Sequence, residues 1–133
     1  MAETKTVLVN DGGAPARIMN FVCGEAIEAG EALKMHTDGN VMLATSNLVS
    51  IIGFALTDAA SGDMVSCVSG KGIVLNVITD AVTVGDELVV DSAKPGFLET
   101  KTAFEADTQE DKECAIALET NATTNTMTKV MVI

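Results

Sequence analysis

The sequence predicts a single all-β domain, built as a small β-barrel or sandwich. Its 133 residues suit one domain with a core of its own. The apolar residues occur in short runs of β-branched and aliphatic side chains, separated by Gly, Asp, Asn and Ser, as is typical of strands joined by turns. A motif from the first half of the chain also recurs in the second half, which favours two similar β units.

Ten segments have the composition of strands, whereas helix signals are weak. The segment Thr102–Lys112 is the best helix candidate, but its charge pattern equally suits a solvated loop. Glycines fall at or between the apolar runs, where turns and bulges need them. In chain order, we expect strands near Arg17–Cys23, Ala32–His36, Val41–Ala44, Ser50–Leu56, Met64–Val68, Gly72–Val77, Glu87–Asp91, Phe97–Thr100, Glu113–Leu118 and Thr128–Ile133.

The internal repeat begins with Ala26–Leu33 (AIEAGEAL), which is echoed 55 residues later by Ala81–Leu88 (AVTVGDEL). Gly53–Leu56 is matched by Ala115–Leu118 at an offset of 62 residues. The growth of the offset falls on an acidic insert around Glu105–Glu113. Each copy is followed by polar turns and further strands. We therefore expect two repeated β-meander halves that close into a barrel or sandwich.

Residues 1–16 lie outside the repeat, and we expect them to form an extended N-terminal arm ahead of a single β domain over residues 17–133. The segment Thr6–Val9 alternates as in a strand. The Gly-Gly and Pro turn residues that follow Asn10 separate this segment from the domain. We expect the arm to be disordered in the free protein and to add as a strand to an exposed sheet edge of a binding partner.

Charge and composition narrow the class of partner. The chain carries 8 Lys and Arg against 19 Asp and Glu, for a formal net charge of −11. It therefore offers neither the basic face that binds nucleic acid nor an attraction to an acidic membrane surface. Hydrophobic residues make up 47% of the chain although Trp and Tyr are absent. Because this aliphatic content exceeds what a small barrel needs, we expect a homo-oligomer that buries part of it between subunits.

Targeting and cysteine signals indicate a protein made in the cytoplasm. The N-terminus lacks the basic start and apolar run of a signal peptide, and the apolar stretches are only as long as strands. Cys23, Cys67 and Cys114 are odd in number and lie far apart in the sequence. We expect all three to be buried thiols rather than disulfides, in a reducing compartment.

The sequence contains no recognisable catalytic or metal-binding set. His36 is the only histidine, and a surface position suits it better than a catalytic triad. Zinc would need closely spaced Cys or His pairs, and the carboxylates lack the spacing of an EF-hand calcium loop. Gly70–Gly72 reads Gly-Lys-Gly, but its flanks favour a hairpin turn over a phosphate loop. We expect no enzyme activity, no cofactor and no metal.

Three segments resemble a known family. Gly53–Val65 reads GFALTDAASGDMV, Ala81–Val90 contains VGDELVV, and Ala115–Glu119 reads AIALE. Over about residues 22–133 the chain resembles the small capsid decoration (cement) proteins of tailed bacteriophages. The family has Gly at the start of the third segment, where this chain has Ala. The long arm and the acidic insert are further departures from the family pattern.

The resemblance implies a structural virion protein. Such a protein is made in the host bacterial cytoplasm, binds the major capsid protein on the outside of an expanded capsid and stabilises the lattice. It implies a homotrimer at threefold positions of the capsid. We expect the N-terminal arm to supply capsid contacts, and the candidate residues are Thr6, Val7, Leu8 and Val9.

Two alternative functions stay open at this stage. One is a small β-barrel module that binds carbohydrate or a small molecule, since β-clip and barrel-sandwich domains share such Ala-Gly-Asp turns. The other, less favoured, is a hydrolase that uses acidic residues. The scarcity of aromatic side chains, which form sugar-binding platforms, weighs against glycoside chemistry.

Overall fold

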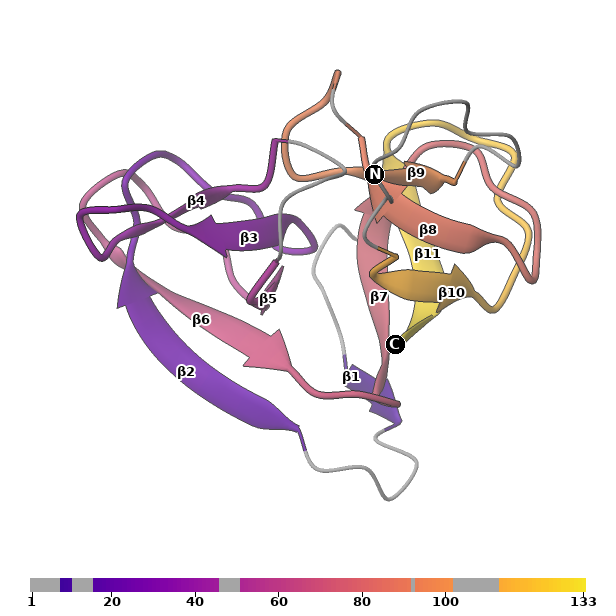
Figure 1. The fold of residues 1–133 in the computed structure, drawn as a ribbon, viewed down its shortest axis with the longest axis horizontal. Coiled ribbons are helices and arrows are strands. Elements are labelled where there is room, and N and C mark those ends of the chain that lie inside the picture. The colour runs from indigo at the N-terminus through magenta and orange to yellow at the C-terminus, as the bar shows by residue number, and fades with distance from the viewer. Residues whose placement is uncertain (1–7, 11–15, 46–50, 92, 102–112) are drawn as a thin grey trace, which may run out of the picture.

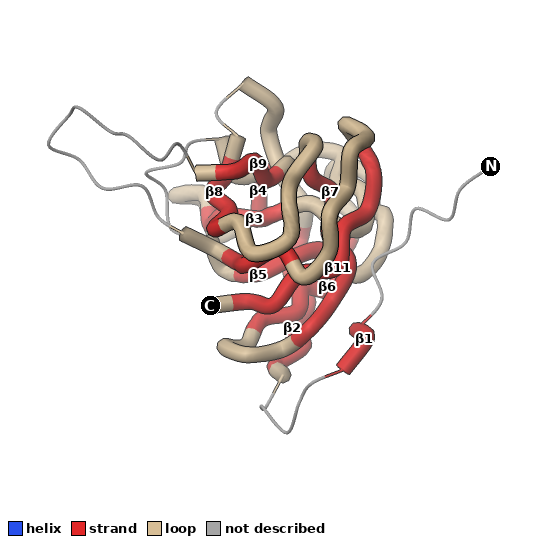
Figure 2. Tube along the Cα trace, turned by 90° about the vertical axis from the view of Figure 1, so that its right-hand side faces the viewer, coloured by secondary structure: helices blue, strands red, loops and turns tan. Residues whose placement is uncertain are grey.

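The protein consists of strands and loops throughout the part of the chain that the computed structural model describes, residues 8–10, 16–45, 51–91, 93–101 and 113–133 (Figure 1). Those residues form no helix, and so none long and apolar enough to cross a membrane (Figure 2). The strands are β1 (Leu8–Asn10), β2 (Arg17–Val22), β3 (Ala32–Met35), β4 (Val41–Leu43), β5 (Gly53–Ala55), β6 (Met64–Ser69), β7 (Val74–Thr79), β8 (Glu87–Val90), β9 (Leu98–Thr100), β10 (Ala115–Ala117) and β11 (Thr126–Val132).

All ten strands predicted from the sequence are present, so the all-β fold class is confirmed. Their bounds shift by a few residues; β6, for example, runs to Ser69 and β11 begins at Thr126. β1 is an additional strand, and it falls inside the segment predicted to be an arm. The candidate helix Thr102–Lys112 lies outside the described residues.

The strands form two sheets with the same internal plan, one from each half of the chain (Figure 1). The first-half sheet has the order β2-β6-β5-β3-β4. The second-half sheet has the order β1-β7-β11-β10-β8-β9. Apart from β1, each strand of the second sheet corresponds to the strand five places earlier in the chain. The internal repeat seen in the sequence is therefore a repeat of the fold.

Equivalent backbone hydrogen bonds follow the offsets of the sequence repeat. In the first half, Ile27 and Ala59 exchange two N–H···O bonds of 2.9 Å. In the second half, Val82 and Asn121 exchange two such bonds of 2.8 and 2.9 Å. These residues are related by the offsets of 55 and 62 found in the sequence. The two copies of the repeat therefore form the same pair of loops, joined by the same two backbone hydrogen bonds.

The strand order within each half departs from that of a β-meander. β5 pairs with β3, and β10 pairs with β8, so the fourth strand of each unit skips its neighbour in sequence. The connections over residues 44–52 and 101–114 are longer than a hairpin loop of about two to five residues. A connection of this length can carry the chain past the preceding strand to the far side of the hairpin.

Each half curls until its first strand meets its third. In the first half, Cys23, at the end of β2, forms a parallel bridge with Val41 of β4. In the second half, Thr79 of β7 pairs in parallel with Leu98 of β9. The curl turns one face of each sheet inward. The architecture is therefore two small, barrel-like β units in tandem.

Two groups of buried apolar side chains hold these units together. The larger group contains residues from both halves and so joins them. It includes Phe54 and Val68 from the first half and Leu75, Leu88 and Val130 from the second. The smaller group belongs to the first half alone and consists of Cys23, Ile27, Leu33, Val41, Ala55, Val65 and Cys67.

The three cysteines are buried and form no disulfide, as the sequence predicts. Burial raises the pKa of Cys67 and that of Cys114 to about 11, because a buried thiolate loses its hydration. Burial also raises the pKa of Cys23, and the nearby Asp63 carboxylate adds to the effect. The thiols are therefore protonated at neutral pH and act as small apolar core residues.

Candidate binding surface

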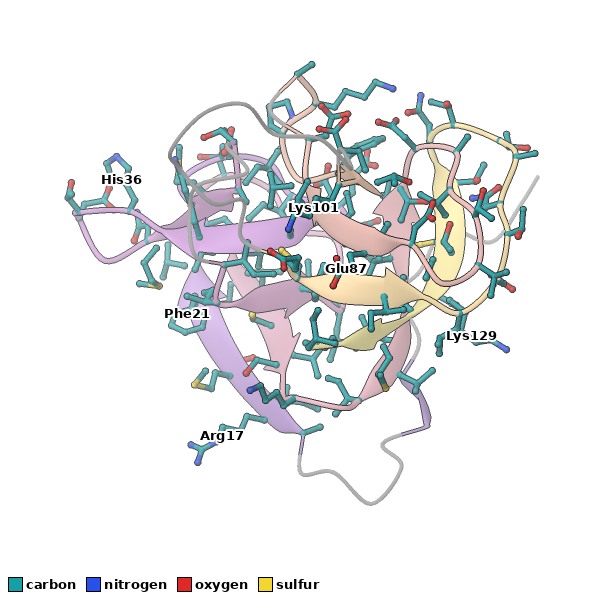
Figure 3. The ribbon with its side chains drawn as sticks, turned by 45° about the vertical axis from the view of Figure 1, so that its right-hand side comes forward. Arg17, Phe21, His36, Glu87, Lys101 and Lys129 are labelled. Atoms are coloured by element: carbon teal, nitrogen blue, oxygen red, sulfur yellow. The ribbon has the colours of Figure 1, made fainter. Side chains whose placement is uncertain are left out.

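His36 lies on the exposed turn between β3 and β4, at one extremity of the molecule (Figure 3). Its Nδ1 atom is 3.1 Å from Asp38 Oδ1, and both side chains are about half exposed. Asn40 donates its backbone N–H to the same carboxylate over 2.9 Å, and this bond, reinforced by His36, lowers the pKa of Asp38. The surface position predicted for His36 is confirmed.

Part of the N-terminal segment is a strand of the body. β1 runs antiparallel to β7, with Leu8 opposite Leu75 and Asn10 opposite Val74. Of the four candidate capsid-contact residues, Leu8 and Val9 lie in β1, whereas Thr6 and Val7 lie outside the described residues. We expected this segment to form a strand on a binding partner. At Leu8 and Val9 it instead forms a strand at the edge of the chain's own sheet.

A cluster of three carboxylates lies where β7, β8 and β9 converge. Oxygen atoms of Asp80, Asp91 and Glu99 lie within 4.8 Å of one another. Lys94 Nζ is 2.7 Å from Asp80 Oδ1. Asp91 is almost fully buried and accepts the backbone N–H of Ala93 over 2.8 Å. Within the described residues, this is the one group with the donors and spacing to ligate a metal ion.

Hydrogen bonds and an ammonium group stabilise the carboxylates of this cluster. Burial, together with a hydrogen bond to Asp80, raises the pKa of Asp91. Burial also acts to raise the pKa of Asp80, but hydrogen bonds from Asp91 and Lys94 outweigh it and the pKa is lowered. The opposite shifts place the pKa of Asp91 above that of Asp80, and Lys94 offsets one carboxylate charge. The arrangement suits a structural clamp on the β8–β9 turn.

A cavity of about 290 Å³ lies beside β5 and the end of β11. Its walls include the apolar residues Ile51, Phe54 and Val132, and the charged residues Lys71 and Glu113. The volume is at the lower end of the range of about 300–1,000 Å³ for small-molecule sites. Its walls combine apolar side chains with one residue of each charge.

Four of the exposed apolar side chains among the described residues lie on β2 and its neighbour β6. We define the β2 surface as Ile18, Met19, Val22 and Met64, which are 59%, 41%, 39% and 56% exposed. Val22 and Met64 are directly opposite each other in the β2–β6 ladder. Arg17 begins β2 and directs its side chain away from the body (Figure 3). Exposed apolar groups that adjoin one another are typical of interaction surfaces.

The complete fold has a counterpart among known structures. The crystal structure of the head fiber gp8.5 N base in bacteriophage phi29 matches it with a TM-score of 0.65 and 14% sequence identity. The match covers 90% of this chain and 95% of that one. The fold resembles that of a phage head-fiber base. No protein-family model and no curated protein sequence matches the chain.

The extent of the match to the head-fiber base is informative. Because 90% of this chain is covered, the similarity includes both halves of the repeat and their relative arrangement. A single five-stranded unit would account for far less of the chain. At 14% identity, what the two proteins share is this backbone plan.

Sequence patterns did not predict two features described above, the exposure of β2 and the carboxylate cluster. The segment Arg17–Val22 (RIMNFV) was recognised as a strand, but its apolar residues occupy both faces and gave no sign that most of them are exposed. The absence of any carboxylate from this strand was the available signal. Asp80, Asp91 and Glu99 were not grouped, because they belong to no spaced motif and meet only through the strand order.

Proposed function

We propose that this chain is a structural virion protein that binds the outer surface of a phage capsid and stabilises the lattice. The observation that carries the proposal is the fold likeness to a phage head-fiber base over 90% of the chain. The sequence resemblance to capsid decoration proteins, which lies in Gly53–Val65, Ala81–Val90 and Ala115–Glu119, supports the same function independently. The partner proposed is the major capsid protein.

The chemistry of the described residues suits this role. Among the described residues, His36 has only the partners of its own turn, and Lys94 forms an ion pair with Asp80 of the carboxylate cluster. The two β units are joined by a common core, which makes a compact body with many exposed loops. We infer that the protein acts by binding and has no enzymatic activity.

Capsid contact is assigned to the N-terminal segment. β1 is the last strand of its sheet, and among the described residues it pairs on one side only, with β7. Its second side presents backbone N–H and C=O groups in the geometry that accepts another strand. Thr6, Val7, Leu8 and Val9 stay the candidate contact residues, with an extended segment of the capsid protein as their partner.

Deletion of residues 2–9 tests this assignment. We expect the truncated protein to lose most of its occupancy on expanded capsids, because the main-chain pairing is lost with the strand. The matched control deletes residues 2–5 and keeps the candidate segment. The midpoint of thermal unfolding, measured for both variants, separates the loss of contact from the loss of fold. If the protein that lacks residues 2–9 still occupies the capsids fully, the assignment is contradicted.

We further propose that three copies gather at threefold positions of the lattice. The support is the aliphatic content of the chain, which exceeds what a small barrel needs, together with the family resemblance. A map of decorated capsids gives the arrangement directly. Copies that bind singly, with no contact between them, would exclude a trimer.

A further inference from the structure

The outer edge of β2 is open along its length. Among the described residues, Arg17–Val22 pair on one side only, with β6, from Arg17 opposite Ser69 to Val22 opposite Met64. Just beyond the strand, Cys23 donates its N–H to Asp63 on the β6 side, and Gly24 donates to Val41 on the other side. Because these directions alternate along a strand, Ile18, Asn20 and Val22 direct their backbone N–H and C=O groups to the open edge.

The equivalent edge in the second half is covered. β7 corresponds to β2 in the repeat, and its residues Val74 and Leu75 are paired with β1. Leu75 is fully buried, whereas Met19, at the equivalent position on β2, is 41% exposed. The strand plan therefore includes a place for one more strand beside β2. Within the described residues, this chain leaves that place empty.

The apolar residues of β2 are arranged symmetrically about the polar residue Asn20. Reading outward, Met19 and Phe21 flank the asparagine, and Ile18 and Val22 follow. Because side chains alternate along a strand, Ile18, Asn20 and Val22 share one face, while Met19 and Phe21 share the other. Phe21 also packs against the smaller, first-half core group. In an antiparallel pair centred on Asn20, each apolar residue would lie opposite an apolar residue on the same face.

The charges also favour a partner with the same sequence. Neither β2 nor β6 contains a carboxylate, although the chain has 19 of them. Two copies can therefore approach along this edge without repulsion between carboxylates. Arg17 lies at one end of the ribbon and Asp63 at the other, beside Cys23. Antiparallel pairing centred on Asn20 places Arg17 of each copy opposite Cys23 of the other and so toward its Asp63.

We propose that β2 pairs antiparallel with β2 of a second copy, about a twofold axis through Asn20. Ile18 then lies opposite the second copy's Val22, and Met19 opposite its Phe21. The outward N–H and C=O groups of Ile18, Asn20 and Val22 make the main-chain bonds of the new ladder. The contact is isologous, because the same strand is used by both copies. It joins the two first-half sheets into one continuous sheet.

This contact is independent of capsid binding and differs from the threefold assembly proposed above. A twofold β2 contact alone gives a dimer in the absence of any capsid. A threefold contact alone gives a trimer. Both together give a hexamer. The mass of the free protein therefore tests the β2 pairing whether or not the protein decorates a capsid.

Sedimentation velocity of the full chain over a range of concentrations is the first test. We expect a dimer or hexamer of the 13.8 kDa chain. Ile18→Lys should raise the dissociation constant of the β2 contact by at least about tenfold, since it removes an apolar pair from each half of the contact and adds charge. Val84→Lys is the matched control, because Val84 is 57% exposed and lies in the other half. It should leave the mass unchanged.

A backbone test and a register test complete the experiment. Asn20→Pro removes an N–H that points to the open edge, so it should abolish the contact while the domain keeps its thermal unfolding midpoint within a few degrees. Asn20→Cys should give a covalent dimer under mild oxidation, because directly opposed residues lie about 5.5 Å apart between Cα atoms. Val84→Cys should not.

Three results would overturn the proposal. One is a monomer at every concentration, and the second is a trimer. The third is an even-numbered oligomer that keeps its mass in both Ile18→Lys and Asn20→Pro. A monomer whose capsid occupancy is lost in Ile18→Lys would assign the open edge to the capsid protein instead of to a second copy.

Discussion

The two halves of the molecule share a strand plan but differ in what covers the first strand of each. β7 is flanked by β1 and β11 and buries most of its side chains, whereas β2, among the described strands, is flanked only by β6 and exposes most of its side chains. The duplicated motifs thus explain the backbone of both halves. The difference in cover leaves the first strand of one half exposed and that of the other half mostly buried.

A second contrast concerns two equivalent turns. Glu31 accepts the backbone N–H of Glu28 over 2.7 Å, and Asp86 accepts that of Thr83 over 2.9 Å. The β8–β9 turn covers the first of these carboxylates, because Gly96 packs against the Glu31 side chain and its carbonyl accepts the N–H of Ala32. Glu31 is only 7% exposed, whereas Asp86 is partly exposed.

The largest difference between the halves is expected at the start of β5 and β10. Gly53 has a positive φ of 155°, and an added Cβ would overlap the Val68 carbonyl oxygen and approach Cys67 Sγ to 2.7 Å. We expect Gly53→Ala to lower the free energy of unfolding by about 3–4 kcal/mol. At the equivalent position, Ala115 is fully buried and its Cβ is accommodated. Denaturant unfolding measures the effect.

Ala115→Gly is the reciprocal variant. It should cost only about 1 kcal/mol, through backbone entropy and one lost methyl group. Equal losses for the two variants would show that the halves do not differ in packing at this position.

A smaller effect is expected from Glu31. Burial raises its pKa to about 7, and the nearby carboxylates of Glu28, Glu25 and Asp58 add to the shift. The folded state therefore binds the proton more tightly than the unfolded state does. The resulting stability is complete below about pH 4.5, falls as the pH rises and is lost above about pH 7, a total of about 2–3 kcal/mol.

Glu31→Gln should remove this part of the pH dependence, because the amide oxygen can still accept the Glu28 N–H. Above pH 7 the variant should be more stable than the parent. Asp86→Asn, in the equivalent turn, should keep the parent's slope between pH 4.5 and 7. Thermal unfolding of the parent and both variants, measured between pH 4.5 and 7, gives the comparison. A parent protein whose unfolding midpoint rises with pH in this interval would contradict the raised pKa of Glu31.

The smallest effect is expected at His36. Its partners lie within the β3–β4 turn, and its side chain is 46% exposed. His36→Ala should leave both the unfolding midpoint and the capsid occupancy unchanged within error. A complete loss of occupancy in a folded His36→Ala protein would give this turn a direct part in binding.

Sequence patterns were sufficient for the strands and for the repeat, because alternation, turn glycines and the Ala26–Leu33 motif are local features. Strand order was not predictable, since the connections before β5 and β10 are too long to fix a partner. For the same reason, the proximity of Asp80, Asp91 and Glu99 could not be predicted from the sequence. The exposure of β2 depends on a neighbouring strand that, among the described residues, only the second half has, and the lack of a carboxylate in β2 was the one local sign of it.

We propose that this two-unit β body decorates a phage capsid. Cryo-electron microscopy of expanded capsids of the cognate phage, incubated with the purified protein, tests it most directly. We expect added density on the outer capsid surface, into which the two curled sheets fit, with the N-terminal strand against the capsid protein. Capsids that stay bare at saturating protein concentration would contradict it.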